Sequence, residues 1–219
     1  MQIVAIDGPA GSGKSSVSKA AAAQLGYGYL DTGAAYRALT WFEIVGGIAT
    51  SSLTEENLKQ EFNYQISLDP NNYWVRVGDK DVTEEIRSPE VAKNVSEIAS
   101  LPEVRSFMKS LTRKLVAESS RDGVIVEGRD ITTVVFPEAN PKVLLTASEE
   151  VRLARREKEL ADSSAVKETV TNRDNRDSKI VNFMKPADGV VLLDSTELNF
   201  EQTVAALVKI IREAEVVNG

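Results

Sequence analysis

The residues best suited to chemistry lie in one short segment near the N-terminus. Residues 8–15 read GPAGSGKS and match the phosphate-binding pattern G-x-x-x-x-G-K-[ST]. Glycines let such a loop turn tightly enough for several backbone N–H groups to converge on phosphate oxygens. Lys14 can reach the β- and γ-phosphates of ATP, and the Ser15 hydroxyl can bind Mg²⁺. The residues expected around the phosphates are Gly8, Pro9, Ala10, Gly11, Ser12, Gly13, Lys14, Ser15 and Ser16.

Polar residues also follow a second predicted strand, residues 28–31. The next segment, residues 32–37, reads TGAAYR. In open parallel sheets, ligands bind at the carboxyl ends of the strands. We expect Thr32 to cap the following helix, and Tyr36 and Arg37 to face a ligand one turn later. The alternative is that Thr32 serves only as a cap and Arg37 is an ordinary surface arginine.

Charged residues end a third strand in the sequence EGRD, residues 127–130. Glu127 is placed to reach the Mg²⁺ shell through water, and Arg129 to bind a phosphate through both prongs of its guanidinium. Asp130 can accept a hydrogen bond from a nucleobase amine or orient an arginine. The alternative is a local ion pair between Arg129 and Asp130.

Arginines cluster twice more in the second half of the chain. Arg152, Arg155 and Arg156 have i, i+3, i+4 spacing, which puts them on one face of a helix. Residues 173–177, RDNRD, place two further arginines three apart. A mobile basic lid that closes over the transferring phosphates and keeps water out explains both clusters. The alternative is that acidic neighbours or solvent offset these charges.

The composition narrows the reaction class. The chain has 219 residues, no histidine, no cysteine and a formal net charge of −7. A Ser-His-Asp triad, a zinc site with histidine or cysteine ligands, and a disulfide are therefore excluded. Phosphoryl transfer suits the remaining residues, because positioning and charge stabilisation do most of that chemistry. The acidic balance indicates no nucleic-acid partner, and the lack of a long apolar run or leader indicates a cytoplasmic protein without a membrane partner.

The apolar pattern predicts the elements that must position these residues. Short β-branched runs separated by helical segments indicate a parallel α/β sheet. The expected strands are 2–7, 28–31, 124–127, 142–146 and 190–193. The expected helices are 14–25, 33–46, 54–61, 88–119, 148–161 and 199–215. Ser88-Pro89 should begin the longest helical stretch and Pro102 should break it. Alternating apolar residues and two turns over 62–86 predict a small inserted antiparallel sheet.

Together, these segments resemble those of bacterial cytidylate kinases. The matching segments span nearly the whole chain and read IDGPAGSGKSS, YLDTGAAYR, VTEEIRSPEVAKNVS, VEGRDITTVVFPEA, KVLLTAS, RDNRDS and VLLDST. The resemblance implies an α/β fold of the P-loop class, with a parallel five-stranded sheet flanked by helices, a small antiparallel sheet inserted in a monophosphate-binding domain, and a short lid. The implied parts are a core of 1–31, 88–161 and 181–219, a monophosphate-binding region of 32–87, and a lid of 162–180.

The resemblance also implies an activity, transfer of the γ-phosphoryl group of ATP to CMP or dCMP by a monomer that uses Mg²⁺. The residues implied to act on the transferred group are Lys14, Arg129, Arg152, Arg155 and Arg156. The residues implied to bind the acceptor are Thr32, Tyr36, Arg37, Ser96, Arg105, Arg129, Asp130, Arg173 and Asp177.

One position departs from the family pattern. Ile180 stands three residues after Asp177, where family members commonly carry an arginine, so the preference between CMP and dCMP is open. The residues alone also leave AMP, UMP and shikimate open as acceptors. Outside enzymes, the alternative is a GTPase or nucleotide-gated binding protein, although the guanine-reading N-K-x-D motif does not occur in the sequence.

Overall fold

The computed structural model describes residues 1–159 and 185–218, and the chain forms two compact units. The first unit comprises Met1–Tyr29 and Ser120–Gly219, and the second comprises Leu30–Ser119. The second unit is therefore one continuous segment inserted into the first.

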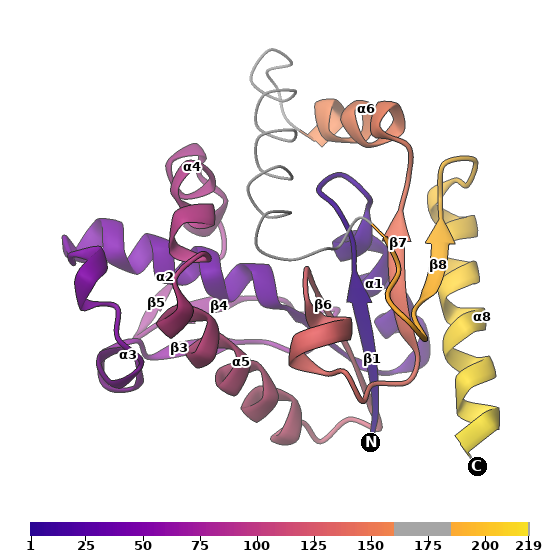
Figure 1. Cartoon of the computed structure of the whole chain (residues 1–219), viewed down its shortest axis with the longest axis horizontal. Helices are drawn as coiled ribbons and strands as arrows, with labels where there is room; N and C mark the ends of the chain where they lie inside the picture. Colours follow the sequence, from indigo (N-terminus) through magenta and orange to yellow (C-terminus); the bar gives the residue numbers. More distant parts are fainter. Residues whose placement is uncertain (160–184, 219) are drawn as a thin grey trace. The chain divides into compact units, whose positions relative to one another are not determined.

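The first unit is built on a β-sheet with the strand order β2–β6–β1–β7–β8 (Figure 1). The strands are β1 (Gln2–Asp7), β2 (Gly28–Asp31), β6 (Gly123–Gly128), β7 (Lys142–Thr146) and β8 (Val191–Asp194). β1 pairs in parallel with β6 and β7, and β7 pairs in parallel with β8. Val4, Ala5 and Ile6 are fully buried, as expected for a central strand that is covered on both faces. The predicted parallel five-stranded sheet is confirmed, and each predicted apolar run forms one of its strands.

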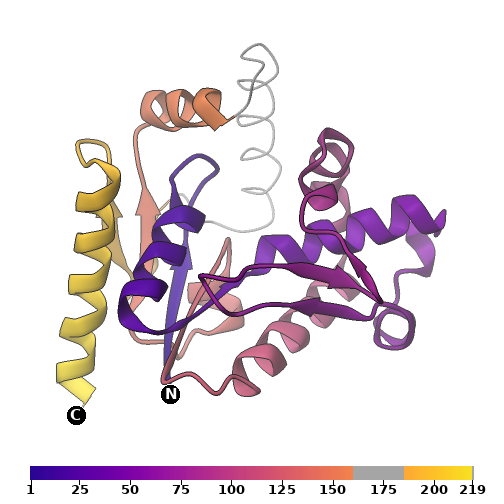
Figure 2. The same cartoon turned by 180° about the vertical axis from the view of Figure 1, so that it is seen from behind.

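Helices cover both faces of this sheet. α1 (Lys14–Leu25) and α8 (Phe200–Asn218) pack side by side on one face (Figure 2), and the π-helical turn η3 (Ile131–Val135) lies on the other (Figure 1). α6 (Glu149–Glu159) follows β7 and confirms the first part of the predicted helix 148–161. The end of that helix and the expected lid over 162–180 lie outside the described residues. Within the described ranges, no helix is both long and apolar enough to cross a membrane.

The second unit contains the predicted antiparallel insertion. Its strands β3 (Tyr64–Ile66), β4 (Val75–Val77) and β5 (Lys80–Asp81) pair in that order (Figure 2). Tyr64, Ile66 and Val75 are buried whereas their neighbours along each strand are exposed, so the apolar alternation did predict one buried face. Gly78 has a φ of 59° in the two-residue turn between β4 and β5, a conformation that favours glycine.

Helices make up the rest of the second unit. They are α2 (Thr32–Gly46), α3 (Glu55–Glu61), α4 (Pro89–Ile98) and α5 (Pro102–Ala117), with the 3₁₀ turns η1 (Thr50–Ser52) and η2 (Glu85–Arg87). Ser88 caps α4, since its Oγ accepts a hydrogen bond from the Val91 N–H at 3.3 Å. Pro102 is the first residue of α5, so the predicted break of the 88–119 stretch is confirmed.

α4 and α5 group with the second unit rather than with the sheet. The sequence assigned residues 88–119 to the core, but their helices pack on α2 and α3. Val104, Phe107 and Met108 of α5 are buried, and the Phe107 ring lies 6.2 Å from the Phe62 ring, centroid to centroid. These contacts explain why the compact units divide the chain near residues 30 and 119. The functional roles expected for the separate domains stay predictions.

Candidate active site

The phosphate-binding loop joins β1 to α1, as the sequence predicts. A side chain on Gly8 would place its Cβ 2.1 Å from the Leu145 carbonyl oxygen, so only glycine fits there. Gly13 precedes α1 with a φ of 83° and carries no side chain that could cover the end of the helix. No side chain caps the first N–H groups of α1, and N–H groups left open at a helix start are the arrangement that binds phosphate.

Glu127 contacts both residues that the motif assigns to chemistry. The Ser15 Oγ donates a hydrogen bond to Glu127 Oε1 at 2.6 Å, and Lys14 Nζ lies 3.8 Å from Glu127 Oε2. The Tyr29 hydroxyl also donates to Oε1, at 3.2 Å. Glu127 is only 2% exposed, so its charge is held at the loop by these three partners. The structure thus places Glu127 beside the phosphate loop, as expected.

The oxygen atoms of Ser15 and Glu127 are a donor set that suits Mg²⁺. Magnesium prefers hard oxygen ligands and usually takes one or two from the protein, with phosphate and water oxygens completing the octahedron. Among the residues that the structure describes, no group of three or more acidic, histidine or cysteine side chains could hold a metal alone. Ser15 and Glu127 could supply two of the oxygen ligands of such an ion.

Asp7 connects the end of β1 to the segment that follows β6. Its Oδ1 accepts a hydrogen bond from the Ile131 N–H at 2.8 Å, and its Oδ2 accepts from the Thr132 N–H at 2.9 Å and the Thr132 hydroxyl at 2.6 Å. Burial raises the pKa of the Asp7 carboxyl, and the hydrogen bonds from Thr132 and Ile131 oppose that rise. Sequence reasoning did not assign Asp7 a role. The available signal was a carboxylate at the end of an otherwise apolar strand.

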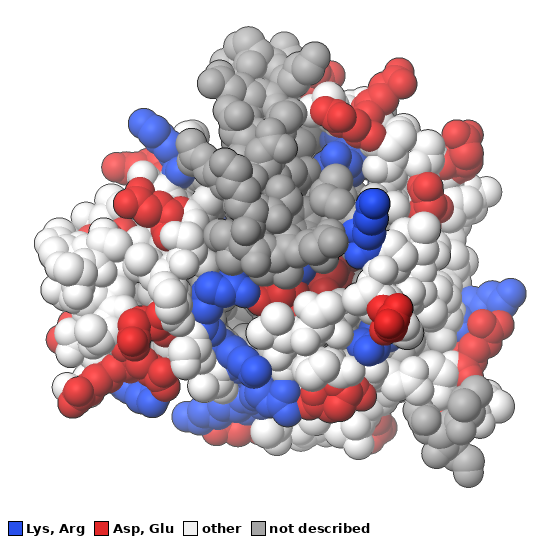
Figure 3. Space-filling model, in the orientation of Figure 1, with Lys and Arg blue, Asp and Glu red and all other residues white. Residues whose placement is uncertain are grey.

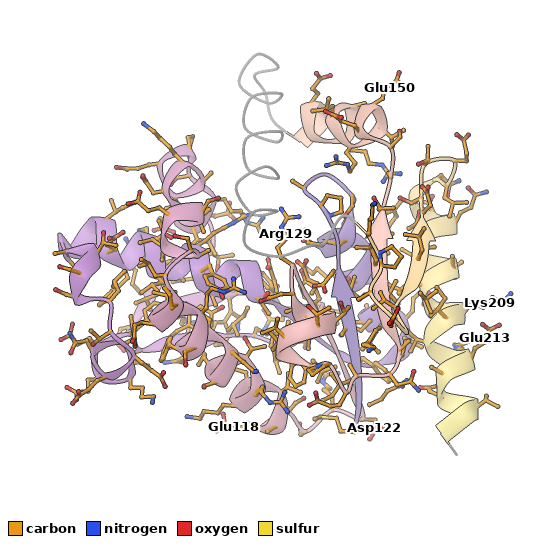
Figure 4. All side chains as sticks on the ribbon, in the orientation of Figure 1. Glu118, Asp122, Arg129, Glu150, Lys209 and Glu213 are labelled. Atoms are coloured by element: carbon orange, nitrogen blue, oxygen red, sulfur yellow. The ribbon has the colours of Figure 1, made fainter. Side chains whose placement is uncertain are left out.

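Three arginines hold the carbonyl oxygens of the phosphate loop. Arg129 Nη1 donates to the Gly8 oxygen, and Arg129 lies at the end of β6 in Figure 4. From α6, Arg152 Nη1 donates to the Ala10 oxygen at 2.8 Å, and Arg155 Nη1 donates to the Ser12 oxygen at 3.2 Å. The structure therefore brings these arginines together with Lys14 and Ser15. The alternative that acidic neighbours or solvent offset the α6 charges is not tested by these contacts.

The remaining predicted residues of the first unit are less fully described. Asp130 precedes η3, and its carbonyl oxygen accepts hydrogen bonds from the N–H groups of Val134 and Val135. The side chain of Arg156 lies outside the described part of the structure, as do Arg173, Asp177 and Ile180.

The predicted acceptor residues of the second unit lie on three helices in contact. Thr32, Tyr36 and Arg37 are on α2, Ser96 is on α4 and Arg105 is on α5, and α2 packs against both other helices. Arg37 Nε is buried and has no hydrogen-bond partner among the described residues. A buried guanidinium nitrogen without a partner is costly, so this position suits an anionic ligand.

The prediction that Thr32 caps α2 is wrong by one residue. Asp31 is the cap, because its Oδ1 accepts a hydrogen bond from the Ala34 N–H at 3.0 Å. Asp31 has extended backbone angles, φ −87° and ψ 100°, whereas Thr32 already belongs to the helix. Both residue types are good caps, and the backbone conformation decides between them.

The cations at the phosphate loop form a local cluster in an acidic protein. The formal net charge is −7, and Lys and Arg side chains lie among Asp and Glu side chains on the described part of the face in Figure 3. A polyanionic ligand therefore gains its attraction from this cluster rather than from the protein as a whole.

A family model and several known proteins match this chain, and all of them carry the same family name. The family model described as cytidylate kinase matches residues 4–213. A cytidylate kinase from Streptomyces avermitilis is 43% identical over 215 residues, which cover 96% of this chain and 93% of that protein. A cytidylate kinase from Exiguobacterium sibiricum is 42% identical over 218 residues, covering 94% and 95%.

A solved structure shares the fold of this chain. An uncharacterised protein from Eubacterium ventriosum superposes with a TM-score of 0.53 at 13% identity, covering 97% of this chain and 99% of that one. The sequence match is far stronger than this likeness and runs through every element around the phosphate loop. This chain belongs to the cytidylate kinase family.

Proposed function

We propose that the protein transfers the γ-phosphoryl group of ATP to CMP or dCMP. An oxygen of the acceptor phosphate attacks the γ-phosphorus, the bond from that phosphorus to the β–γ bridging oxygen breaks, and the products are ADP and CDP or dCDP. The observation that carries the proposal is the joining of Lys14, Ser15 and Glu127 at a phosphate-binding loop in a member of the cytidylate kinase family.

The chain's own residues supply binding and charge rather than a proton acceptor. The acceptor phosphate is already an anion, so its attacking oxygen needs no side-chain base. Lys14 and the loop N–H groups hold the β- and γ-phosphates, and Arg129, Arg152 and Arg156 neutralise charge on the transferred group. Arg155, the fourth arginine expected there, is considered separately because its terminal N–H groups already have acceptors. Ser15, with Glu127 acting through water, would hold Mg²⁺, and the ion would supply charge neutralisation at the phosphates.

We propose that nine residues bind the acceptor. They are Thr32, Tyr36, Arg37, Ser96, Arg105, Arg129, Asp130, Arg173 and Asp177. Arg37 has direct support, because the unpartnered Nε described above would be satisfied by an acceptor phosphate. We further propose that the protein acts as a monomer in the cytoplasm, on free nucleotides rather than nucleic acid.

An acceptor panel tests this proposal. ATP consumption is measured with CMP, dCMP, UMP, AMP and shikimate for the natural chain and for Arg37→Ala. CMP and dCMP should be turned over fastest, and Arg37→Ala should raise the KM for CMP while ATP binding stays nearly unchanged. Faster turnover of UMP, AMP or shikimate, or tight GTP binding without transfer to any acceptor, would overturn it.

A further inference from the structure

Arg155 of α6 has hydrogen-bond acceptors at both terminal nitrogens of its guanidinium group. Its Nη1 donates to the Ser12 carbonyl oxygen at 3.2 Å and to the Ser195 hydroxyl at 3.0 Å. Its Nη2 donates to the carbonyl oxygens of Ser195 at 2.9 Å and of Leu198 at 3.4 Å. A guanidinium carries four N–H groups on these two nitrogens, and each has an acceptor within the described part of the chain. Arg155 therefore has no terminal N–H left for a phosphate.

The Ser195 side chain fixes Arg155 from the other side. Ser195 follows β8 and is fully buried. Its hydroxyl donates to the Thr146 carbonyl oxygen at 2.9 Å while accepting from Arg155, and its N–H donates to the same oxygen at 2.8 Å. The guanidinium thus joins the phosphate loop to a rigid point between the ends of β7 and β8.

The bond to the Ser12 carbonyl sets the direction of the next N–H group. A peptide unit is planar and trans, so its C=O and N–H point in opposite directions. With the Ser12 oxygen held by Arg155, the Gly13 N–H must point away from Arg155. Arg152 holds the Ala10 oxygen at 2.8 Å and fixes the Gly11 N–H in the same way. Gly11 and Gly13 both belong to the motif whose N–H groups cradle phosphate.

We propose that Arg155 is a positioning residue that orients the Gly13 N–H toward the phosphates of the donor nucleotide, with Ser195 holding it in place. This reassigns Arg155 from the phosphate clamp that its spacing suggested. The inference rests on the proposed function only in requiring that the loop binds a triphosphate.

Inorganic tripolyphosphate with Mg²⁺ is the probe, because its binding does not depend on which acceptor the enzyme uses. Isothermal titration calorimetry on the full chain compares Arg155→Met, Arg155→Lys and Ser195→Ala with the natural protein. Arg212→Met, an exposed arginine of α8, is the matched control. Amide spectra of ¹⁵N-labelled protein report the Gly11 and Gly13 N–H groups directly, and thermal unfolding reports stability.

Arg155→Met should weaken tripolyphosphate binding by about tenfold, the loss expected for a charge-assisted hydrogen bond that orients a ligand donor. It should raise the KM for ATP, leave the KM for CMP unchanged and shift the Gly13 amide signal in the absence of ligand. Arg155→Lys should recover little, since an ammonium cannot span the Ser12 and Ser195 acceptors as a planar fork does. Ser195→Ala should weaken binding by about threefold, because it removes one neutral hydrogen bond.

Three results would overturn the inference. If Arg155→Met binds tripolyphosphate as the natural protein does and its Gly13 amide signal does not move, Arg155 does not orient the loop. Full recovery in Arg155→Lys would show that Arg155 acts on phosphate as a charge. If Arg155→Met does not fold, an unchanged affinity in both Arg155→Lys and Ser195→Ala would count equally against it. Loss of CMP specificity in the acceptor panel would refute the proposed function alone and leave this result standing.

Discussion

Replacement of Asp7 by asparagine should destabilise the fold by an amount that depends on pH. The carboxyl accepts hydrogen bonds from the Ile131 N–H, the Thr132 N–H and the Thr132 hydroxyl. An asparagine of the same shape has one acceptor oxygen, and its NH₂ group can donate to the Thr132 hydroxyl while the oxygen accepts from Ile131. The Thr132 N–H then faces another donor, and an unsatisfied buried donor costs about 1–3 kcal/mol.

The pH dependence follows from the raised pKa of the Asp7 carboxyl. Burial is the largest cause of that rise above the ordinary value of 3.8. A raised pKa means that the folded protein binds this proton more tightly than the unfolded chain. The stability that the proton contributes is present below 3.8 and is lost as the pH rises through the folded-state pKa. The natural protein should therefore lose stability relative to Asp7→Asn as the pH rises.

Urea unfolding of both proteins in a pH series that starts below 3.8 and rises from there measures this difference. The exposed Asp79→Asn variant, on the turn between β4 and β5, is the control and should leave the free energy of unfolding nearly unchanged. A gap between the natural protein and Asp7→Asn that widens with rising pH would refute the reasoning, because it would mean that the hydrogen bonds outweigh burial.

Two further substitutions test the loop and the cap. Gly8→Ala should abolish ATP binding or folding, because the new Cβ would lie 2.1 Å from the backbone oxygen of Leu145. ATP titration measures the binding and circular dichroism the folding. An affinity for ATP near that of the natural protein would contradict the prediction. Asp31→Ala should lower the free energy of unfolding by about 1 kcal/mol through loss of the cap on Ala34. Thr32→Ala should cost less in the same urea titration, and the reverse order would restore Thr32 as the cap.

Elements with a strong local pattern were predictable from the sequence. The strands of the parallel sheet are continuous apolar runs, and the inserted sheet shows a clean alternation at Tyr64 and Ile66. Pro89 and Pro102 lie at helix starts because proline lacks the N–H that a helix interior requires. Local chemistry is sufficient in each of these cases.

Features that depend on distant partners were not predictable in the same way. The spacing of Arg152 and Arg155 shows that they share a helix face, but their acceptors are carbonyl oxygens more than a hundred residues away. The partners of Asp7 are equally remote in sequence. The choice of Asp31 over Thr32 depends on where the strand stops and the helix begins, which packing of the two elements decides.

Asp7 and Arg129 each hydrogen-bond to the backbone that follows the other's strand. The carboxylate that precedes the phosphate loop holds the backbone after β6, and the guanidinium that follows β6 holds the first carbonyl of the loop. Displacement of either segment therefore weakens hydrogen bonds that hold the other. A nucleotide that shifts the loop therefore changes the affinity of Arg129 for an anion. By thermodynamic linkage, the anion changes the affinity of the loop for the nucleotide by the same factor.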